Sequence, residues 1–189
     1  MSAQAIDDVA FAFVDTETTG LSPKSGGRVC EIAVLKVRAG KTLESFCRLV
    51  DPGCPIDFGA RMVHGITDEM VSGQPRFADL ADAVEGLLAD AVFVGHNANF
   101  DLGFLASEFR YAGREMPKVH VLDTLRWARK HYRFPSNRLG AIVSHYGLDA
   151  AGAHRAGRDA DLLRQVFERF LADFKKTKEV RTLEDLLKL

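Results

Sequence analysis

Residues 14–20 read VDTETTG and directly follow an apolar run over residues 9–14. Side chains of a strand alternate between its two faces, so Asp15 and Glu17 point the same way, roughly 7 Å apart along the backbone. Two like charges held this close raise each other's pKa and cost stability. Either the strand ends here in a turn, with one acid capping the next segment, or another group compensates the two charges.

The composition is that of a soluble globular protein of one domain. The 189 residues are 47% hydrophobic and 27% charged, which is enough for a substantial core. The formal net charge is −1, so any basic surface for nucleic acid has to be local. The N-terminus has no signal-peptide pattern and no stretch is long enough to span a membrane, so we expect a cytoplasmic protein. The cysteines, at positions 30, 47 and 54, lack metal-site spacing and are expected to be reduced core thiols.

The hydrophobic period changes along the chain. Strands are expected at residues 9–15, 28–38, 41–50, 91–96 and 119–123. Helices are expected at residues 76–90, 99–113 and about 158–174. Three meandering strands followed by strand–helix alternation predict an α/β structure whose sheet is antiparallel on one side and parallel on the other. We expect residues 1–174 to form the domain and residues 175–189 to form a charged tail or a partner-binding helix.

Further acids lie at the ends of these expected elements. Asp101 falls in the first turns of a helix, Asp123 closes a strand, and Asp159 lies early in the last helix, five residues after His154. Asp101 and Asp159 could simply complement helix dipoles, each worth under about 1 kcal/mol. For Asp123 we favour the role of a helix N-cap, because a helix is expected to follow it directly.

The functional interpretation brings Asp15, Glu17, Asp101 and Asp159 together. Carboxylate oxygens suit Mg²⁺ or Mn²⁺, and four carboxylates can neutralise two divalent ions. A cation would offset the repulsion between Asp15 and Glu17. Two ions about 4 Å apart can clamp the attacking and leaving oxygens of a phosphodiester displacement. A histidine beside them can deprotonate the attacking water.

Four segments carry a resemblance to a known family: FAFVDTETTGLSP, HGITDEM, GHNANFDLGFL and HRAGRDA, in this order. Over residues 9–174 the chain resembles the DEDDh 3′→5′ exonucleases, which include the proofreading epsilon subunit of bacterial DNA polymerase III. The resemblance implies a ribonuclease H-like α/β fold, a five-stranded mixed sheet flanked by helices on both faces.

The resemblance also implies residue roles. Asp15, Glu17 and Asp159 would bind the two ions directly, with Asp15 bridging them and Asp101 joining mainly through water, while His154 would be the general base. The pocket for the terminal nucleotide would be shaped by Thr18, Leu21, His64, Asn97 and Phe100. Of these, His64 and Phe100 fit a packed interior group equally well.

The chain departs from the proofreading subunit in two places. The residues before His64 read DFGARMV and lack the acid that contacts the 3′ end in that subunit. Residues 175–189 carry no glutamine motif for a sliding clamp. These departures concern the proofreading role and leave the nuclease residues intact.

No acid lies between Asp123 and Asp149, an interval in which basic and aromatic residues are interleaved. They are Arg126, Trp127, Arg129, Lys130, Tyr132, Arg133, Phe134 and Arg138. Such a mixture suits single-stranded nucleic acid, through phosphate neutralisation and base stacking. The alternative is a solvated helix face whose aromatic side chains pack inward, which we favour for Trp127 and Phe134.

We therefore expect an exonuclease dependent on two Mg²⁺ or Mn²⁺ ions that releases nucleoside 5′-monophosphates from 3′ ends. Single-stranded DNA is favoured over RNA, and a DNA polymerase subunit is a candidate partner. One alternative is a ribonuclease that trims RNA 3′ ends. Another is a non-catalytic module that binds nucleic acid or a polymerase. The oligomeric state stays open.

Overall fold

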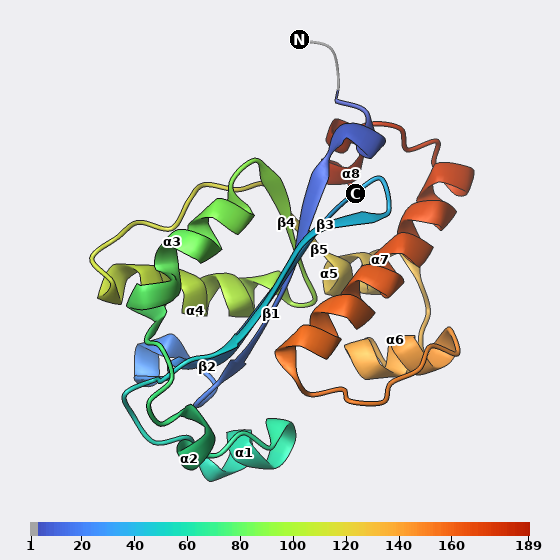
Figure 1. Cartoon of the computed structure of the whole chain (residues 1–189). Coiled ribbons are helices and arrows are strands. Elements are labelled where there is room, and N and C mark those ends of the chain that lie inside the picture. Colours follow the sequence, from blue (N-terminus) through green and yellow to red (C-terminus); the bar gives the residue numbers. More distant parts are fainter. Residues whose placement is uncertain (1–3) are drawn as a thin grey trace.

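The computed structural model describes residues 4–189 and has a five-stranded sheet between two layers of helices (Figure 1). The strands are β1 (Ala10–Thr18), β2 (Val29–Arg38), β3 (Lys41–Leu49), β4 (Ala91–Gly95) and β5 (Val121–Asp123). Their spatial order is β3-β2-β1-β4-β5. The pairs β1–β2 and β2–β3 are antiparallel, whereas β1–β4 and β4–β5 are parallel. The predicted mixed α/β sheet is confirmed.

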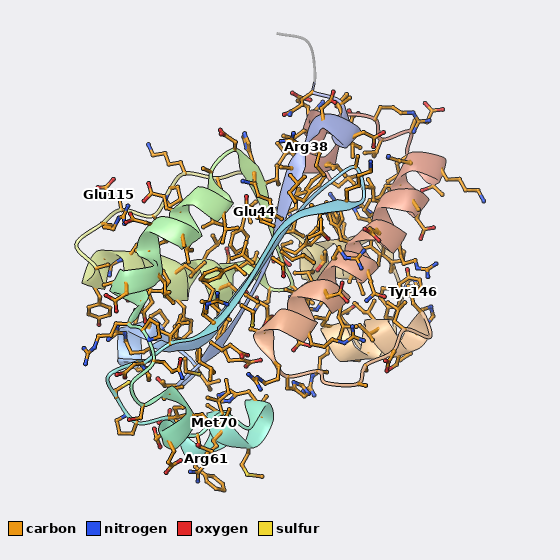
Figure 2. The ribbon with its side chains drawn as sticks, in the orientation of Figure 1. Arg38, Glu44, Arg61, Met70, Glu115 and Tyr146 are labelled. Carbon is orange, nitrogen blue, oxygen red and sulfur yellow. The ribbon has the colours of Figure 1, made fainter. Side chains whose placement is uncertain are left out.

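Helices cover both faces of this sheet. They are α1 (Phe58–His64), α2 (Asp68–Val71), α3 (Phe77–Leu88), α4 (Ala98–Tyr111), α5 (Thr124–His131), α6 (Leu139–His145), α7 (Ala156–Thr177) and α8 (Leu183–Leu187), with single 3-10 turns at Ile6–Asp8 and Pro23–Ser25. Figure 1 shows α3 and α4 on one side of the sheet and α5, α6 and α7 on the other. Side chains crowd the space between the sheet and both layers (Figure 2). Within residues 4–189, no helix combines the length and the apolar character needed to cross a bilayer.

The central strand β1 is buried on both faces, and its alternation decides where the acids point. Phe11 and Phe13 face α7, where their ring centroids lie 5.0 and 5.3 Å from that of Phe167. Ala12 and Val14 face the other way, into the core formed with α3 and α4. Because side chains alternate, Asp15 and Glu17 follow Phe13 toward α7, and Thr16 follows Val14 toward α4.

Some element boundaries differ from the predictions. β1 does not end in a turn at the acids but continues to Thr18, because β2 pairs with it as far as Thr18 opposite Val29. The turn interpretation of Asp15 and Glu17 is therefore wrong. Helix α6, which begins at Leu139, lies outside the helices expected above. Helix α1 was not predicted, and α7 is longer than expected at both ends.

The expected domain boundary at residue 174 falls inside α7, which runs on to Thr177 without a break. The segment after α7 returns to the core: Val180, Leu183 and Leu186 are buried among the residues that α7 covers. A β-bridge pairs Thr182 with Ala5 near the start of the described chain. Residues 175–189 are thus packed against the domain, and their binding of a partner stays a prediction.

Candidate active site

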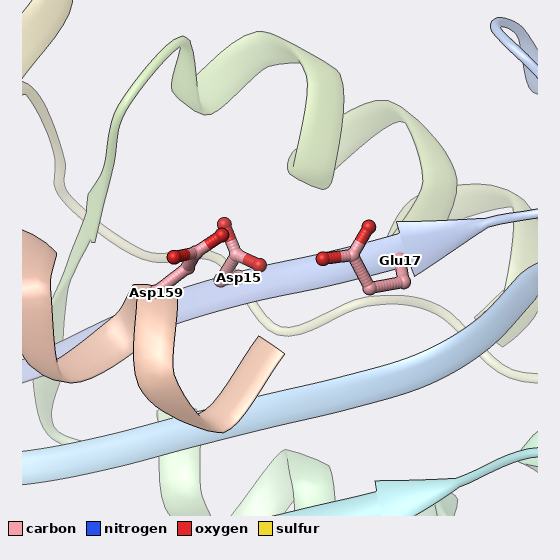
Figure 3. A group of neighbouring side chains, drawn as sticks. All are labelled: Asp15, Glu17 and Asp159. Atoms are coloured by element: carbon pink, nitrogen blue, oxygen red, sulfur yellow. The ribbon is translucent and has the colours of Figure 1, made fainter. Parts of the chain in front are cut away.

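Three carboxylates meet where β1 approaches the start of α7. Asp15 and Glu17 project from the last part of β1, and Asp159 projects from the first turn of α7 (Figure 3). Each offers one carboxylate oxygen, and these oxygens all lie within 4.8 Å of one another. All three side chains are partly buried. The strand period and the helix start thus bring together three of the four acids predicted to converge.

The fourth acid, Asp101, borders this group from the other face of the sheet. It lies in the first turn of α4 and is 5% exposed. The backbone N–H of Thr16 donates to its Oδ1 at 3.0 Å, and the Thr16 hydroxyl donates to the same oxygen at 2.8 Å. Asp101 is close enough that its charge raises the pKa of Asp15. We conclude that Asp101 is held beside the three-carboxylate group rather than inside it.

Burial and mutual repulsion disfavour the ionised forms of these acids. Burial, together with the charge of Asp159, raises the pKa of Glu17 to about 8. Burial and the charges of Asp101 and Glu17 raise the pKa of Asp15 well above its usual range. Burial also raises the pKa of Asp101 to about 7, although the hydrogen bonds from Thr16 act in the opposite direction. Oxygen donors crowded in this way fit a hard divalent cation, which would favour their ionised forms.

His154 lies beside Asp159 on the loop that leads into α7. It is exposed, and its backbone has a φ of 65°, in the left-handed region that a residue with a β-carbon seldom adopts. Its backbone N–H donates to Asp159 Oδ2 at 3.1 Å. Burial raises the pKa of Asp159, while this bond and the charge of His154 act to lower it. The histidine predicted to be the base therefore borders the carboxylate group.

Two of the residues predicted to bind the nucleotide are tied to the backbone. The Thr18 hydroxyl donates to the carbonyl of Gly20 at 2.8 Å. The N–H of Ile66 donates to His64 Nδ1 at 3.0 Å, so the ring proton is on Nε2, which lies 3.3 Å from the Thr18 carbonyl oxygen. His64 is buried, and burial lowers its pKa. Its ring joins the end of α1 to the end of β1, and its contact with substrate stays a prediction.

The other three predicted contacts differ in exposure. Leu21 is 91% exposed, directly after the Thr18–Gly20 turn. Asn97 is also exposed, with a φ of 73°, and its N–H donates to Asp123 Oδ1 at 3.0 Å. Phe100 is half-buried, its ring centroid 4.9 Å from that of Phe104. Leu21 and Asn97 are thus accessible to a ligand, and binding by all three stays a prediction.

Asp123 has the capping role that the sequence predicted. Its carboxylate accepts hydrogen bonds from the N–H groups of Leu125 and Arg126 in the first turn of α5. The same oxygen accepts the N–H of Asn97, so Asp123 also fixes the turn between β4 and α4. That turn precedes Asp101, and Asp123 therefore supports the site without entering it.

Two residues near the site were missed. Thr16 holds Asp101, and the buried Glu31 on β2 forms an ion pair with Arg155, directly after His154. Glu31 did leave a signal in the sequence, because it is an acid inside the apolar stretch RVCEIAVLKVR. Thr16 left none, because threonine is common in strands.

The basic interval after β5 separates into an exposed and a packed part. Arg129 and Arg138 are exposed and line a pocket of about 490 Å³ together with His96, Asn97 and Asn137. Lys130 instead donates to the backbone oxygen of Leu189. The aromatic residues pack inward: Trp127 is buried, and Tyr132 and Phe134 pack against the same core. The inward packing favoured for Trp127 and Phe134 is confirmed, so these rings do not offer faces for base stacking.

The sequence was compared with models of known protein families. Residues 12–167 match the RNase_T family model, described as an exonuclease. The chain belongs to this family of exonucleases. The matched range begins within β1 and ends within α7, so it contains all the acids described above.

Two curated relatives are similar to the chain over most of its length. It is 34% identical over 167 residues to the DNA polymerase III PolC-type of Halalkalibacterium halodurans, covering 88% of this chain and 12% of that protein. It is 34% identical over 158 residues to the 3′-5′ exonuclease DinG of Bacillus subtilis, covering 83% of this chain and 17% of that protein. The chain thus spans less than a fifth of the length of these relatives.

A solved structure matches almost end to end. Exonuclease X, in complex with 5′ overhanging duplex DNA, is 28% identical with a TM-score of 0.72, covering 95% of this chain and 98% of that one. The expected membership in an exonuclease family and the expected ribonuclease H-like fold are confirmed.

Proposed function

We propose that this protein is a divalent-metal-dependent 3′→5′ exonuclease that removes nucleoside 5′-monophosphates from DNA 3′ ends. The observation that carries the proposal is the group formed by Asp15, Glu17 and Asp159, whose oxygens lie within 4.8 Å of one another. Family membership gives the reaction class, and the group supplies the ligands which that chemistry requires. A module that only binds nucleic acid would not need three carboxylates crowded within 4.8 Å of one another.

We assign metal binding to the carboxylates and proton transfer to His154. Asp15, Glu17 and Asp159 would hold Mg²⁺ or Mn²⁺, with Asp101 kept in place by Thr16 beside them. The cation supplies a positive charge that stabilises the phosphodiester oxygens as charge builds on them. His154, through an imidazole nitrogen, would take the proton from the water that attacks the phosphorus. The bond from phosphorus to the 3′ oxygen of the preceding nucleotide would break, that oxygen would take a proton from solvent to become the new 3′ hydroxyl, and the terminal nucleotide would leave as a 5′-monophosphate.

The strand entering this site would pass the pocket at the end of β4. Among residues 4–189, the guanidinium groups of Arg129 and Arg138 have neither an ion pair nor a side-chain hydrogen bond. Asn97 lines the same pocket and lies at the start of α4, four residues before Asp101. Free guanidinium groups in this place suit the phosphates of a nucleic-acid strand.

DNA is favoured over RNA as the substrate. The 28% identical Exonuclease X was solved with a DNA duplex, and one of the two curated relatives compared above is a DNA polymerase by name. The polymerase among them also makes a DNA polymerase a candidate partner for this chain, for proofreading or repair.

The experiment is a release assay with end-labelled oligonucleotides. The purified protein is incubated with matched DNA and RNA, single-stranded and duplex, in Mn²⁺, in Mg²⁺ and in chelator. We expect mononucleotides from DNA in either metal and none in chelator or with Asp15→Asn. Release from RNA alone would favour the ribonuclease alternative. No release from any substrate, with binding retained, would favour the binding module and contradict the proposal.

A further inference from the structure

An ion pair between a buried carboxylate and a half-exposed arginine joins β2 to the residue after His154. The side chain of Glu31 is 2% exposed. Its two carboxylate oxygens each lie 3.1 Å from Nε of Arg155, and Oε1 also accepts a hydrogen bond from Nη2 of Arg155. Its Oε2 accepts the backbone N–H of Ala156 at 2.8 Å, the first residue of α7. One carboxylate therefore fixes both the side chain of residue 155 and the backbone of residue 156.

These contacts restrain the backbone that carries His154. On its other side, the N–H of His154 donates to Asp159 at 3.1 Å, with the residue in its left-handed conformation. A non-glycine residue persists in this conformation only when its surroundings impose it. Glu31 and Asp159 together impose it, because they hold three consecutive residues from two directions.

Close packing already fixes the helix itself. Ala33 on β2 packs against Ala156 and Ala160 of α7, with all three almost fully buried. A β-carbon at Gly157 would lie only 3.1 Å from Sγ of Cys47. The position of Asp159 thus follows from helix packing, whereas His154 lies outside the helix and depends on Glu31 and Arg155.

Stability alone is a weak reason for this ion pair. Burial of the Glu31 carboxylate costs desolvation free energy, which offsets much of its attraction to Arg155. Glu31 also stands opposite Glu17 in the pairing of β1 with β2, and so adds an acid next to an already acidic site. Arg155 neutralises that charge while placing its own backbone beside His154.

We propose that Glu31 is a positioning residue that sets the place of the His154 imidazole through Arg155 and the N–H of Ala156. This inference rests on the proposed nuclease function. It assigns to Glu31 no contact with cation or substrate, and its effect is transmitted through His154.

The test is a mutant cycle measured by single-nucleotide release. Glu31→Gln should lower kcat by about 10- to 100-fold, as a displaced reacting group does, with little change in KM for a DNA oligonucleotide. Mn²⁺ should still raise the melting temperature, because the three carboxylates remain. In the His154→Ala background, Glu31→Gln should change kcat by less than about twofold, because coupled residues are not additive. An equal loss in both backgrounds would overturn the proposal.

A matched control exists on the other side of the sheet. Glu108 of α4 is also 2% exposed, accepts two hydrogen bonds from Arg28 at 2.8 and 2.7 Å, and accepts the N–H of Val29 at 3.0 Å. Glu108→Gln should lower the melting temperature about as much as Glu31→Gln and leave kcat unchanged. If both variants lower kcat equally, Glu31 is merely structural.

A second variant covers the case in which Glu31→Gln does not fold. Arg155 has a side chain that is 46% exposed, so Arg155→Lys keeps the charge and loses only the two-nitrogen contact with Glu31. It should reproduce the loss of kcat, and the loss should again vanish in the His154→Ala background. If wild type is active and Arg155→Lys is equally active, this inference fails and the nuclease function stands. If wild type itself releases nothing, the proposed function fails first.

Discussion

Thr16 holds Asp101 by two hydrogen bonds to one oxygen: its N–H lies 3.0 Å and its hydroxyl 2.8 Å from Asp101 Oδ1. The two residues are 85 positions apart in the chain. Because Thr16 alternates with Asp15 and Glu17 along β1, this strand presents two acids on one face and, on the other face, the two hydrogen-bond donors that hold Asp101. The site therefore lies at the end of a central strand and takes acids from both faces of the sheet.

Thr16→Val removes the hydroxyl donor and keeps the shape of the side chain. Without this donor Asp101 should shift, and activity should fall by about 10- to 100-fold, as is usual when a residue that orients a ligand is replaced. The free energy of unfolding should fall by about 1 kcal/mol, the net contribution of one buried hydrogen bond. Release kinetics and urea unfolding measure the two effects. Thr16→Ser, which keeps the hydroxyl, should be as active as wild type. Equal activity of Thr16→Val and wild type would show that the hydroxyl hydrogen bond to Asp101 is dispensable.

Divalent cations should stabilise the protein if the carboxylates bind them. An ion at 100 times its dissociation constant stabilises the folded state by about 2.7 kcal/mol, which is readily seen as a rise in melting temperature. We expect this rise with millimolar Mn²⁺, and we expect Asp15→Asn to abolish both the rise and the activity. The exposed Asp8, at the opposite end of β1, gives the control Asp8→Asn, which should behave as wild type. A wild-type melting curve indifferent to Mn²⁺ would count against the metal site.

Without metal, the same acids should make the fold less stable as the pH rises. Glu17 has its pKa raised from 4.5 to about 8, so between these values the folded state binds more protons than the unfolded state. Stability then falls with increasing pH through this window. Urea unfolding in chelator at pH 5, 6.5 and 8 measures the slope.

The matched variant for this prediction is Glu17→Gln, which removes the titrating group. His64 and His96, whose pKa values burial lowers, favour folding as the pH rises and partly mask the effect. The comparison between variants cancels their contribution. Glu17→Gln should be more stable than wild type at pH 8 and should lose that advantage near pH 5. A constant difference between the two proteins would contradict the prediction.

Arg129 and Arg138 should govern the binding of nucleic acid more than its cleavage. Replacing both with Ala should weaken binding of a DNA oligonucleotide and flatten its dependence on salt, with little change in turnover at saturating substrate. Arg110, exposed in the last turn of α4, provides the control Arg110→Ala. Fluorescence anisotropy at several salt concentrations measures how steeply the binding constant depends on salt. If this dependence is equal in wild type, the double variant and Arg110→Ala, the two arginines form a solvated surface and do not bind nucleic acid.

The sequence was sufficient for the strands and for the alignment of Asp15 with Glu17, because both depend on a local period. The sequence placed Asp159 at a helix start, and the packing of α7 brings it to the other two acids. The face on which Asp101 lies could not be predicted, since it depends on how α4 packs against Thr16. The ion pair of Glu31 with Arg155 could not be predicted either, because the two residues are 124 positions apart and meet only through tertiary packing. The continuation of β1 through the acids likewise depended on pairing with β2.

The role of His154 is the assignment on which the subtype of this nuclease depends. As a general base it must be neutral to accept a proton, so activity should be lost in acidic solution. His154→Ala should lose about 10²- to 10⁴-fold in turnover, the usual contribution of a positioned base. Its Mn²⁺-dependent thermal stabilisation should persist, because Asp15, Glu17 and Asp159 are untouched. His145, exposed at the end of α6, gives the control His145→Ala, which should keep the wild-type pH profile. If His154→Ala retains near-wild-type turnover at neutral pH, another group accepts the proton, and Glu31 then has no base to position.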